Sequence, residues 1–373
     1  KPMPKLPTEP KSILIVKLSS IGDVIHALPV ASALRRRFPE TGLSWLVSRK
    51  AREIVSEHPH LDRVIVVGGK AKDGDIPIPS IEHPFLAARV LREIGFDVAL
   101  DLQGLIRSSL FSFLSGAGIR VGYRSLKEAA FLFSNVRLIR PTRDMHVVDA
   151  YLRFAEILGA SAHPVEFSIA TSQQHEEKVN GLLSQAGVGT GDKMVAICPG
   201  SSWRAKTWPP ERLGSVADHI AEKHGLLPVI VGSKSDIPRA DAVIANSRTT
   251  SLNLAGKTNL KELAVLLKRC LAFVGNDSGP THLAAAVGRP VVATYGPTDA
   301  NLLRPYGDEH ITIVSSVPCR PCRRRSLAER CSHLSCLTEI APSEVCAALD
   351  RLISTVALSQ RPATTTSRDE EHA

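Results

Sequence analysis

The chain has 373 residues, of which 43% are hydrophobic and 22% are charged. This length favours two domains, and this composition is typical of a globular protein with an apolar core. No apolar run approaches the roughly 18 residues that span a bilayer, and the Pro-rich segment 1–10 lacks the apolar stretch of a secretory signal. We therefore expect a cytoplasmic protein.

The charge is basic: 46 Lys and Arg against 37 Asp and Glu give a net charge of +9. This excess favours an anionic partner, and a nucleic acid, an anionic lipid surface or a phosphorylated sugar would each suit it. Aromatic residues make up only 5% of the chain, so no stacking platform for bases accompanies the basic residues. Solvated helix faces account for part of the charge. The arginines gather in the segments 35–37, 49–52, 137–143 and 320–325.

Short β-branched runs alternate with helical patterns along most of the chain, which indicates two successive sets of βα units. The first half predicts strands at 13–16, 43–47, 64–67 and 98–102, and the second half at 194–198, 228–231, 271–274, 291–294 and 311–314. We expect two doubly wound domains with a cleft between them, spanning 11–185 and 190–342. The boundary is placed at 185–192, where three glycines crowd a polar stretch.

Helical patterns fill the gaps between the strands, for example at 262–270 and 281–287. Pro29 lies inside the first of them, so that helix is kinked or begins afresh there. A last helix is expected at 343–358, followed by a disordered polar tail at 359–373. The segment 120–126 fits a strand or a loop, and the pattern does not decide between them.

The loop after the first strand, residues 17–23, ends in an acid and opens the first helix. Free N–H groups at a helix start favour an anion, yet Asp23 places a carboxylate there. This arrangement favours proton transfer or helix capping over phosphate binding.

Two loops in the second half carry groups suited to a phosphate. Ser201 and Ser202 follow a strand, and Lys206 comes soon after, so hydroxyls and an ammonium could hold phosphate oxygens. A Ser N-cap and a surface lysine are the structural alternative. The segment 275–282 also follows a strand and contains Asp277, Ser278, Gly279 and His282; such a turn presents N–H groups to an anion, and segment 296–298 would line the same cleft.

Asp236 follows another strand and could accept hydrogen bonds from a ribose or cap a helix. No Walker motif and no G-x-G-x-x-G follows any strand, which removes the usual support for an ATPase or a dinucleotide oxidoreductase. Cys319 and Cys322 have zinc-ligand spacing, whereas Cys331 and Cys336 are separated by four residues. Reduced thiols packing a loop are the favoured interpretation.

The segments 17–29, 101–108, 206–209, 276–286 and 296–298 together resemble the bacterial ADP-heptose:lipopolysaccharide heptosyltransferases, glycosyltransferase family 9, over 13 to about 352. The subgroup most similar is heptosyltransferase I. The resemblance implies an α/β fold of GT-B type, in which two Rossmann-like domains face each other across a cleft. The N-terminal domain would bind the acceptor and the C-terminal domain the nucleotide sugar.

The resemblance also implies roles for individual residues. Asp23 matches the catalytic base; Ser201, Ser202 and Lys206 match the diphosphate segment; and Asp277, Ser278, Gly279 and His282 match a second donor loop. Asp236 stands where relatives often carry a glutamate for the ribose. Candidate acceptor-binding residues are Ser20, Gly22, Gln103, Arg107, Arg120 and Arg137, with Arg63 as a further candidate.

The reaction implied is an inverting transfer of heptose from ADP-heptose to the Kdo of Kdo2-lipid A. It would need no cofactor and no metal, and it would occur on the anionic cytoplasmic face of the inner membrane, with no nucleic acid involved. One alternative is a GT-B transferase with another nucleotide sugar or a later core acceptor, as in heptosyltransferase II. A distant alternative is a basic nucleic-acid-binding protein with a zinc site at Cys319, Cys322, Cys331 and Cys336.

Overall fold

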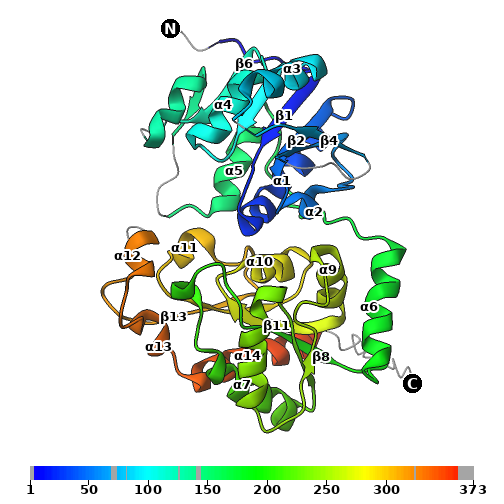
Figure 1. Ribbon diagram of the computed structural model, residues 1–373, viewed down its shortest axis with the longest axis vertical. Helices are drawn as coiled ribbons and strands as arrows, with labels where there is room; N and C mark the ends of the chain where they lie inside the picture. Colours follow the sequence, from blue (N-terminus) through cyan, green and yellow to red (C-terminus); the bar gives the residue numbers. More distant parts are fainter. Residues whose placement is uncertain are drawn as a thin grey trace, which may run out of the picture.

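The protein is described here by a computed structural model that covers residues 4–68, 74–80, 82–124, 127–139, 144–322 and 325–359. These residues form two lobes, one above the other in Figure 1, each built around a wholly parallel sheet. Helices lie on both faces of each sheet, which is the doubly wound arrangement predicted from the alternating pattern.

The N-terminal sheet has the strand order β4-β3-β2-β1-β5-β6-β7, and the C-terminal sheet has the order β10-β9-β8-β11-β12-β13. The N-terminal strands are β1 Ser12–Val16, β2 Gly42–Ser48, β3 Arg63–Val67, β4 Asp75–Ile78, β5 Val98–Asp101, β6 Ile119–Tyr123 and β7 Val136–Leu138. The C-terminal strands are β8 Met194–Cys198, β9 Leu227–Ile230, β10 Leu252–Asn253, β11 Cys270–Asn276, β12 Val291–Tyr295 and β13 Ile311–Val314.

Fourteen α-helices and three 3-10 helices are assigned in the described residues. In the first lobe these are α1 Ile21–Arg37, α2 Arg52–Val55, α3 Pro84–Ile94, α4 Ile106–Leu114, η1 Lys127–Phe133 and α5 Val147–Glu156. The others are α6 Gln173–Gln185, η2 Arg204–Lys206, α7 Pro210–His224, η3 Lys234–Asp236, α8 Ile237–Ala245, α9 Leu260–Arg269, α10 Gly279–Ala286, α11 Ala300–Leu303, α12 Arg325–Glu329, α13 Ser335–Thr338 and α14 Pro342–Ser359.

Burial explains why the central strands were predictable. The last four residues of β1 and all of β8 are buried, because helices cover both faces of a parallel sheet and its strands therefore read as continuous apolar runs. The loops that follow β1, β8 and β11 line one cavity between the two lobes, which lie one above the other in Figure 1.

Several contacts join the two lobes directly. The N-terminal ends of α1 and α10 pack against each other, and the Tyr306 hydroxyl donates to Asp149 Oδ1 on α5 over 2.8 Å. On the other side of the cleft, the backbone N–H of Leu260 donates to Glu53 Oε2 over 3.1 Å. The lobes are thus held at both ends of the cleft.

The structure differs from the sequence-based expectation at the sheet edges and at the lobe boundary. Strands β4, β7 and β10 were not predicted. In the undecided segment 120–126, residues 120–123 belong to strand β6, and residues 125 and 126 lie outside the described residues. Helix α6 already packs on α9 of the C-terminal lobe, as Figure 1 shows, so the chain changes lobe before α6 rather than at 185–192. Helix α1 runs through Pro29 as one helix, without a fresh start.

The last helix, α14, spans residues close to those expected, and the tail beyond Ser359 lies outside the described residues. Among the described helices, none is both long enough and apolar enough to cross a membrane.

Candidate active site

Asp23 lies in the first turn of α1, directly after the loop that follows β1. The backbone N–H and the hydroxyl of Ser20 both donate to Asp23 Oδ2, over 3.0 and 2.7 Å. The Lys17 ammonium lies 3.9 Å from the other oxygen, Oδ1. The carboxylate therefore caps its helix through Oδ2, while Oδ1 has no hydrogen-bond donor within the described residues and is available to a substrate.

The surroundings of Asp23 keep it ionised. Burial raises the pKa of this carboxyl group, but the nearby Lys17 charge and the hydrogen bonds from Ser20 outweigh that effect, so the pKa lies below its usual value. Lys17 is itself buried, and its ammonium donates to the Tyr151 hydroxyl over 2.8 Å. At neutral pH the site therefore presents a carboxylate that can accept a proton.

The loop at the carboxyl end of β8 contributes Ser201, Ser202 and Lys206 from the opposite lobe. The Ser201 hydroxyl donates to the backbone carbonyl of Asp277 over 3.0 Å, and the Lys206 ammonium lies 2.6 Å from Asp277 Oδ2. The two donor segments predicted from the sequence are therefore in direct contact.

Asp277 is a buried carboxylate at the centre of this group. Besides Lys206, it accepts a hydrogen bond from the Thr298 hydroxyl over 2.6 Å, and His282 Nε2 lies 3.6 Å from its Oδ1. Burial raises the pKa of Asp277, but His282 and Lys206 more than offset this and lower the pKa to about 2. Asp277 is thus an anion that fixes the positions of Lys206 and His282.

The helices α1 and α10 meet at two glycines. A Cβ atom added at Gly22 would lie 2.7 Å from His282 Cδ2, and one added at Gly279 would lie 3.0 Å from Ile21 Cγ2. Only glycine leaves space for this approach. It brings the N-termini of two helices, with their unpaired N–H groups and positive dipole ends, to the same place.

The result is a small cavity of about 70 Å³ between the lobes. This small cavity is lined by Ser20, Gly22, Asp23, His26, Ser202, Lys206, Asp277, Ser278, Gly279, His282 and Leu303. Leu303 also lines a second pocket of about 230 Å³, whose wall includes Trp203, Pro297 and Thr298.

His26 belongs to the segment 17–29, but no role was predicted for it. In the structure it lies in the cavity wall. Its ring packs on His282 with a centroid distance of 4.1 Å. Both ring nitrogens are buried, and neither has a hydrogen-bond partner within the described residues. Burial lowers the pKa of His26 well below its usual value, so the imidazole is neutral. The sequence signal was its position one turn after Asp23 on α1.

Other predicted residues lie outside the cavity. The Asp236 carboxylate accepts hydrogen bonds from the N–H and the hydroxyl of Ser233, over 2.9 and 2.6 Å. It therefore caps a helical turn, which is the structural role that the sequence also allowed. Gln103 accepts from the N–H groups of Leu18 and Ser19, over 2.8 and 3.2 Å, and supports the loop before α1. Neither side chain lines the cavity.

The arginines predicted to bind the acceptor are spread over the N-terminal lobe, not gathered in the cavity. The Arg120 guanidinium donates to the carbonyls of Phe133 and Ala117, over 2.9 and 2.6 Å, which makes it a structural residue of its own lobe. Arg137 lies over the Phe131 ring at 5.1 Å. Arg107 is exposed on α4, and Arg63 lines a different pocket.

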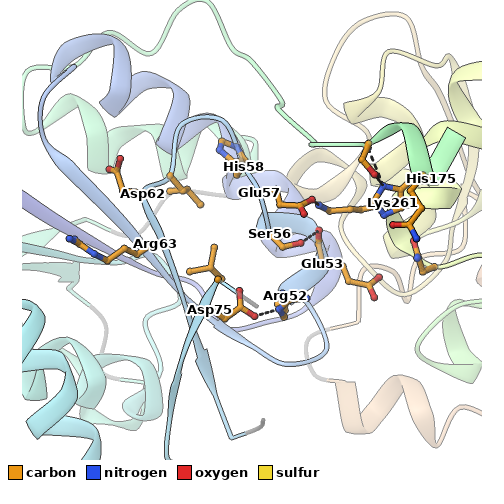
Figure 2. A pocket seen from close by; sticks show the side chains of 16 residues that line it. Arg52, Glu53, Ser56, Glu57, His58, Asp62, Arg63, Asp75, His175 and Lys261 are labelled. Carbon is orange, nitrogen blue, oxygen red and sulfur yellow. Dashed lines mark hydrogen bonds and ion pairs between the residues drawn. The ribbon is translucent and has the colours of Figure 1, made fainter. Parts of the chain in front are cut away.

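That different pocket, of about 570 Å³, lies between α2 and β3 of one lobe and α6 and α9 of the other (Figure 2). Two ion pairs lie in its wall, Arg52 with Asp75 and Lys261 with Glu57. The Lys261–Glu57 pair crosses between the lobes and helps to hold them together.

The four clustered cysteines are free thiols. Burial and the neighbouring thiols Cys319 and Cys331 raise the pKa of Cys322. In the described part of the chain these cysteines do not form a compact group of three metal-ligand atoms.

Two parallel α/β lobes that face each other across a polar cavity define the GT-B type of glycosyltransferase fold. The structure of the *E. coli* ADP-heptose lps heptosyltransferase II is similar over 92% of this chain and 99% of that one, with a TM-score of 0.71 and 24% identity. The model of glycosyltransferase family 9 (heptosyltransferase) matches residues 86–333, and the chain belongs to this family.

Two relatives have similar sequences over most of their lengths. The lipopolysaccharide core heptosyltransferase OpsX of *Haemophilus influenzae* is 29% identical over 82% of this chain and 85% of its own. The lipopolysaccharide heptosyltransferase 1 of *Pseudomonas aeruginosa* is 26% identical over 84% of this chain and 86% of its own. The family resemblance expected from the motifs is confirmed.

Proposed function

We propose that this protein transfers a heptose from ADP-heptose to the Kdo of the lipopolysaccharide inner core, with inversion at the anomeric carbon. The observation that carries the proposal is the position of Asp23: an ionised carboxylate on one lobe that shares a cavity with Lys206, Ser202 and the start of α10 on the other. In a family 9 chain, this arrangement supports the proposal of a base that faces a diphosphate site.

Asp23 is suited to be the general base. An inverting transfer requires one group to remove the proton of the acceptor hydroxyl as that oxygen attacks the anomeric carbon. Asp23 Oδ1 has no hydrogen-bond donor among the described residues, whereas Oδ2 is held by Ser20. The cap thus fixes the carboxylate in one orientation and leaves the other oxygen for the reaction.

The leaving diphosphate gains negative charge as the glycosidic bond breaks. Lys206, the Ser202 hydroxyl and the N–H groups at the start of α10 surround the place where that charge would develop. The Ser201 hydroxyl, which donates to the Asp277 carbonyl, would support this arrangement. The adjoining pocket has the Trp203 ring and the apolar side chains of Leu302 and Leu303 in its wall, which suits a flat nucleobase. The transfer would then proceed without a metal or cofactor.

His26 is a further candidate for contact with the sugar. A buried imidazole without partners costs roughly 1–3 kcal/mol for each unsatisfied group, so its retention in the cavity wall favours a role in binding. A neutral imidazole has one donor and one acceptor nitrogen, and sugar hydroxyls match both.

The acceptor side of the proposal rests on the N-terminal lobe. Its surface carries a set of exposed apolar side chains, here called the apolar surface residues: Phe85, Leu86, Ile106, Phe113, Leu132 and Ile139. Helices α3, α4 and η1, which carry most of them, pack side by side. The exposed Arg107 lies next to Ile106 on the same helix. Apolar residues among cations suit an anionic lipid surface, and we propose that the enzyme works on the cytoplasmic face of the inner membrane.

A second candidate function is transfer to a later core acceptor. The two relatives and the similar structure carry the names of different heptosyltransferase types, and the cavity residues hold a diphosphate irrespective of the acceptor. The choice between these acceptors depends on the N-terminal lobe.

The nucleotide is tested by thermal unfolding with ADP, UDP and GDP. A ligand present at about 100 times its Kd adds roughly 2.7 kcal/mol to the free energy of unfolding. We expect ADP to raise the midpoint temperature most, and Lys206→Ala to reduce that shift. An equal or larger shift with UDP or GDP would contradict ADP-heptose as the donor.

A further inference from the structure

A cluster of two histidines and one aspartate lies on the C-terminal lobe, outside the active site. His219 and His224 stand near the C-terminal end of α7, and Asp350 lies on α14, which packs against α7. Both imidazole Nε2 atoms lie 2.7 Å from the same oxygen, Asp350 Oδ1. Asp350 is more than 120 residues from either histidine in the sequence.

The three donor atoms have the arrangement that a metal ion requires. One Nε2 from each histidine and one carboxylate oxygen all lie within 4.8 Å of one another. A zinc ion binds imidazole nitrogen at about 2.0–2.1 Å and carboxylate oxygen at about 2.0–2.2 Å, so small side-chain rotations would bring all three into its coordination sphere. All three side chains are partly buried, with exposed fractions of 16–25%.

The surroundings leave room for a fourth ligand. His219 and Asp350 line a solvent pocket of about 610 Å³, and Cys346, one helical turn before Asp350, lines it too. The Lys223 ammonium lies 2.7 Å from Asp350 Oδ2, but its side chain is 56% exposed and can move into solvent. The pocket also contains Asp218 and Glu222, so the added positive charge would meet acidic neighbours.

We propose that His219, His224 and Asp350 bind one zinc ion, with the fourth position open to water from the pocket. The ion would clamp α14 to α7. Because both elements lie at the base of the lower lobe in Figure 1, away from the cleft, the ion would serve stability and take no part in the transfer.

The test is a zinc titration of the chelator-stripped full chain against a chromogenic competitor at neutral pH. We expect one equivalent to bind to the wild-type protein and to raise its midpoint of thermal unfolding. His219→Ala and Asp350→Asn should each weaken this binding by at least about 10-fold, because a lost ligand costs at least as much as a lost outer-shell contact.

Three controls make the result decisive. Lys223→Ala removes the ion pair between Lys223 on α7 and Asp350 on α14 and should leave zinc binding intact or tighter. His83→Ala removes an exposed histidine of the other lobe and should have no effect. The double variant Cys319→Ser/Cys322→Ser should still bind the equivalent. Loss of binding in the cysteine variant, unchanged affinity in His219→Ala, or no binding to the wild type would each overturn the proposal.

Discussion

The Asp23 carboxylate has two oxygens in different surroundings, and this difference leads to the first prediction. The asparagine of Asp23→Asn can still accept hydrogen bonds from Ser20, but it cannot take a proton. We therefore expect kcat to fall by at least about 100-fold. Donor affinity should stay near that of the wild type, because the proposed donor site lies on the other lobe. Both are measured by steady-state kinetics and ADP binding.

Asp236 provides a matched control for this variant. It accepts hydrogen bonds from Ser233 in the same way that Asp23 accepts them from Ser20, but it does not line the cavity. Asp236→Asn should therefore disturb a similar cap while kcat stays close to the wild-type value. A nearly normal kcat in Asp23→Asn would leave Asp23 as a cap and refute its role as the base.

The lowered pKa of Asp23 gives a prediction for the pH profile. A base works in its deprotonated form, and a pKa below the usual value keeps Asp23 deprotonated throughout the mildly acidic range. We expect kcat/KM to remain flat from about pH 7 down to about pH 5, where Asp of ordinary pKa near 3.9 is also ionised. A loss of activity with a midpoint near 6.5 would instead point to a histidine.

At the scale of the elements, the contact between α1 and α10 assembles the site. Gly22→Ala would place a methyl group 2.7 Å from the buried His282 ring, so the two helices would have to separate. We expect a loss of about 1–3 kcal/mol in the free energy of unfolding, which is typical of overpacking, together with lower activity. Chemical denaturation and steady-state assays measure the two effects.

The control for this substitution is Gly181→Ala on α6. A Cβ at Gly181 would meet no atom within 4 Å, and Gly181 lies within a helix. Because alanine is the better helix former, this variant should be more stable by roughly 0.5–1 kcal/mol. If Gly22→Ala were as stable and active as the wild type, close packing of α1 on α10 would not be needed.

The elements also show what the sequence could predict. Central strands such as β1 and β8 were predicted because burial on both faces makes them continuous apolar runs. The edge strand β4 has the sequence DIPI, and β10 has only two residues, so neither carries such a run. The boundary was misplaced because the glycines at 187–191 mark the end of α6, whereas packing on α9 decides which lobe α6 belongs to.

The candidate site was predictable where residues follow central strands. Loops after β1, β8 and β11 must meet at the carboxyl ends of their sheets, so Asp23, Lys206 and Asp277 could be grouped from the sequence. The pairing of Lys206 with Asp277 could not, because it depends on side-chain positions within the C-terminal lobe. The burial of His26 could not, because it depends on how the two lobes pack. Arg120 was assigned to the acceptor on charge alone, and charge does not reveal that backbone carbonyls already hold it.

For the whole molecule, the net charge of +9 and the apolar surface residues predict binding to anionic membranes. Co-sedimentation with anionic liposomes should weaken as salt rises, because the Debye length falls from about 10 Å at 0.1 M to about 3 Å at 1 M. Phe85→Ser combined with Leu132→Ser should reduce binding at every salt concentration, since these side chains are 88% and 66% exposed.

Leu327→Ser provides the matched control for the liposome assay, because Leu327 is 58% exposed on the C-terminal lobe and is not one of the apolar surface residues. It should bind liposomes like the wild type. Binding that does not change with salt, or that Leu327→Ser reduces as strongly as the double variant does, would contradict docking through the N-terminal lobe.

The most direct test of the account is mass spectrometry of the product formed from ADP-heptose and Kdo2-lipid A. We predict that the wild-type protein adds one heptose to the acceptor and releases ADP, and that Asp23→Asn forms far less of this product in the same time. No heptose addition to Kdo2-lipid A by a folded protein that binds ADP, or equal product formation by Asp23→Asn, would contradict the proposed reaction or its base, respectively.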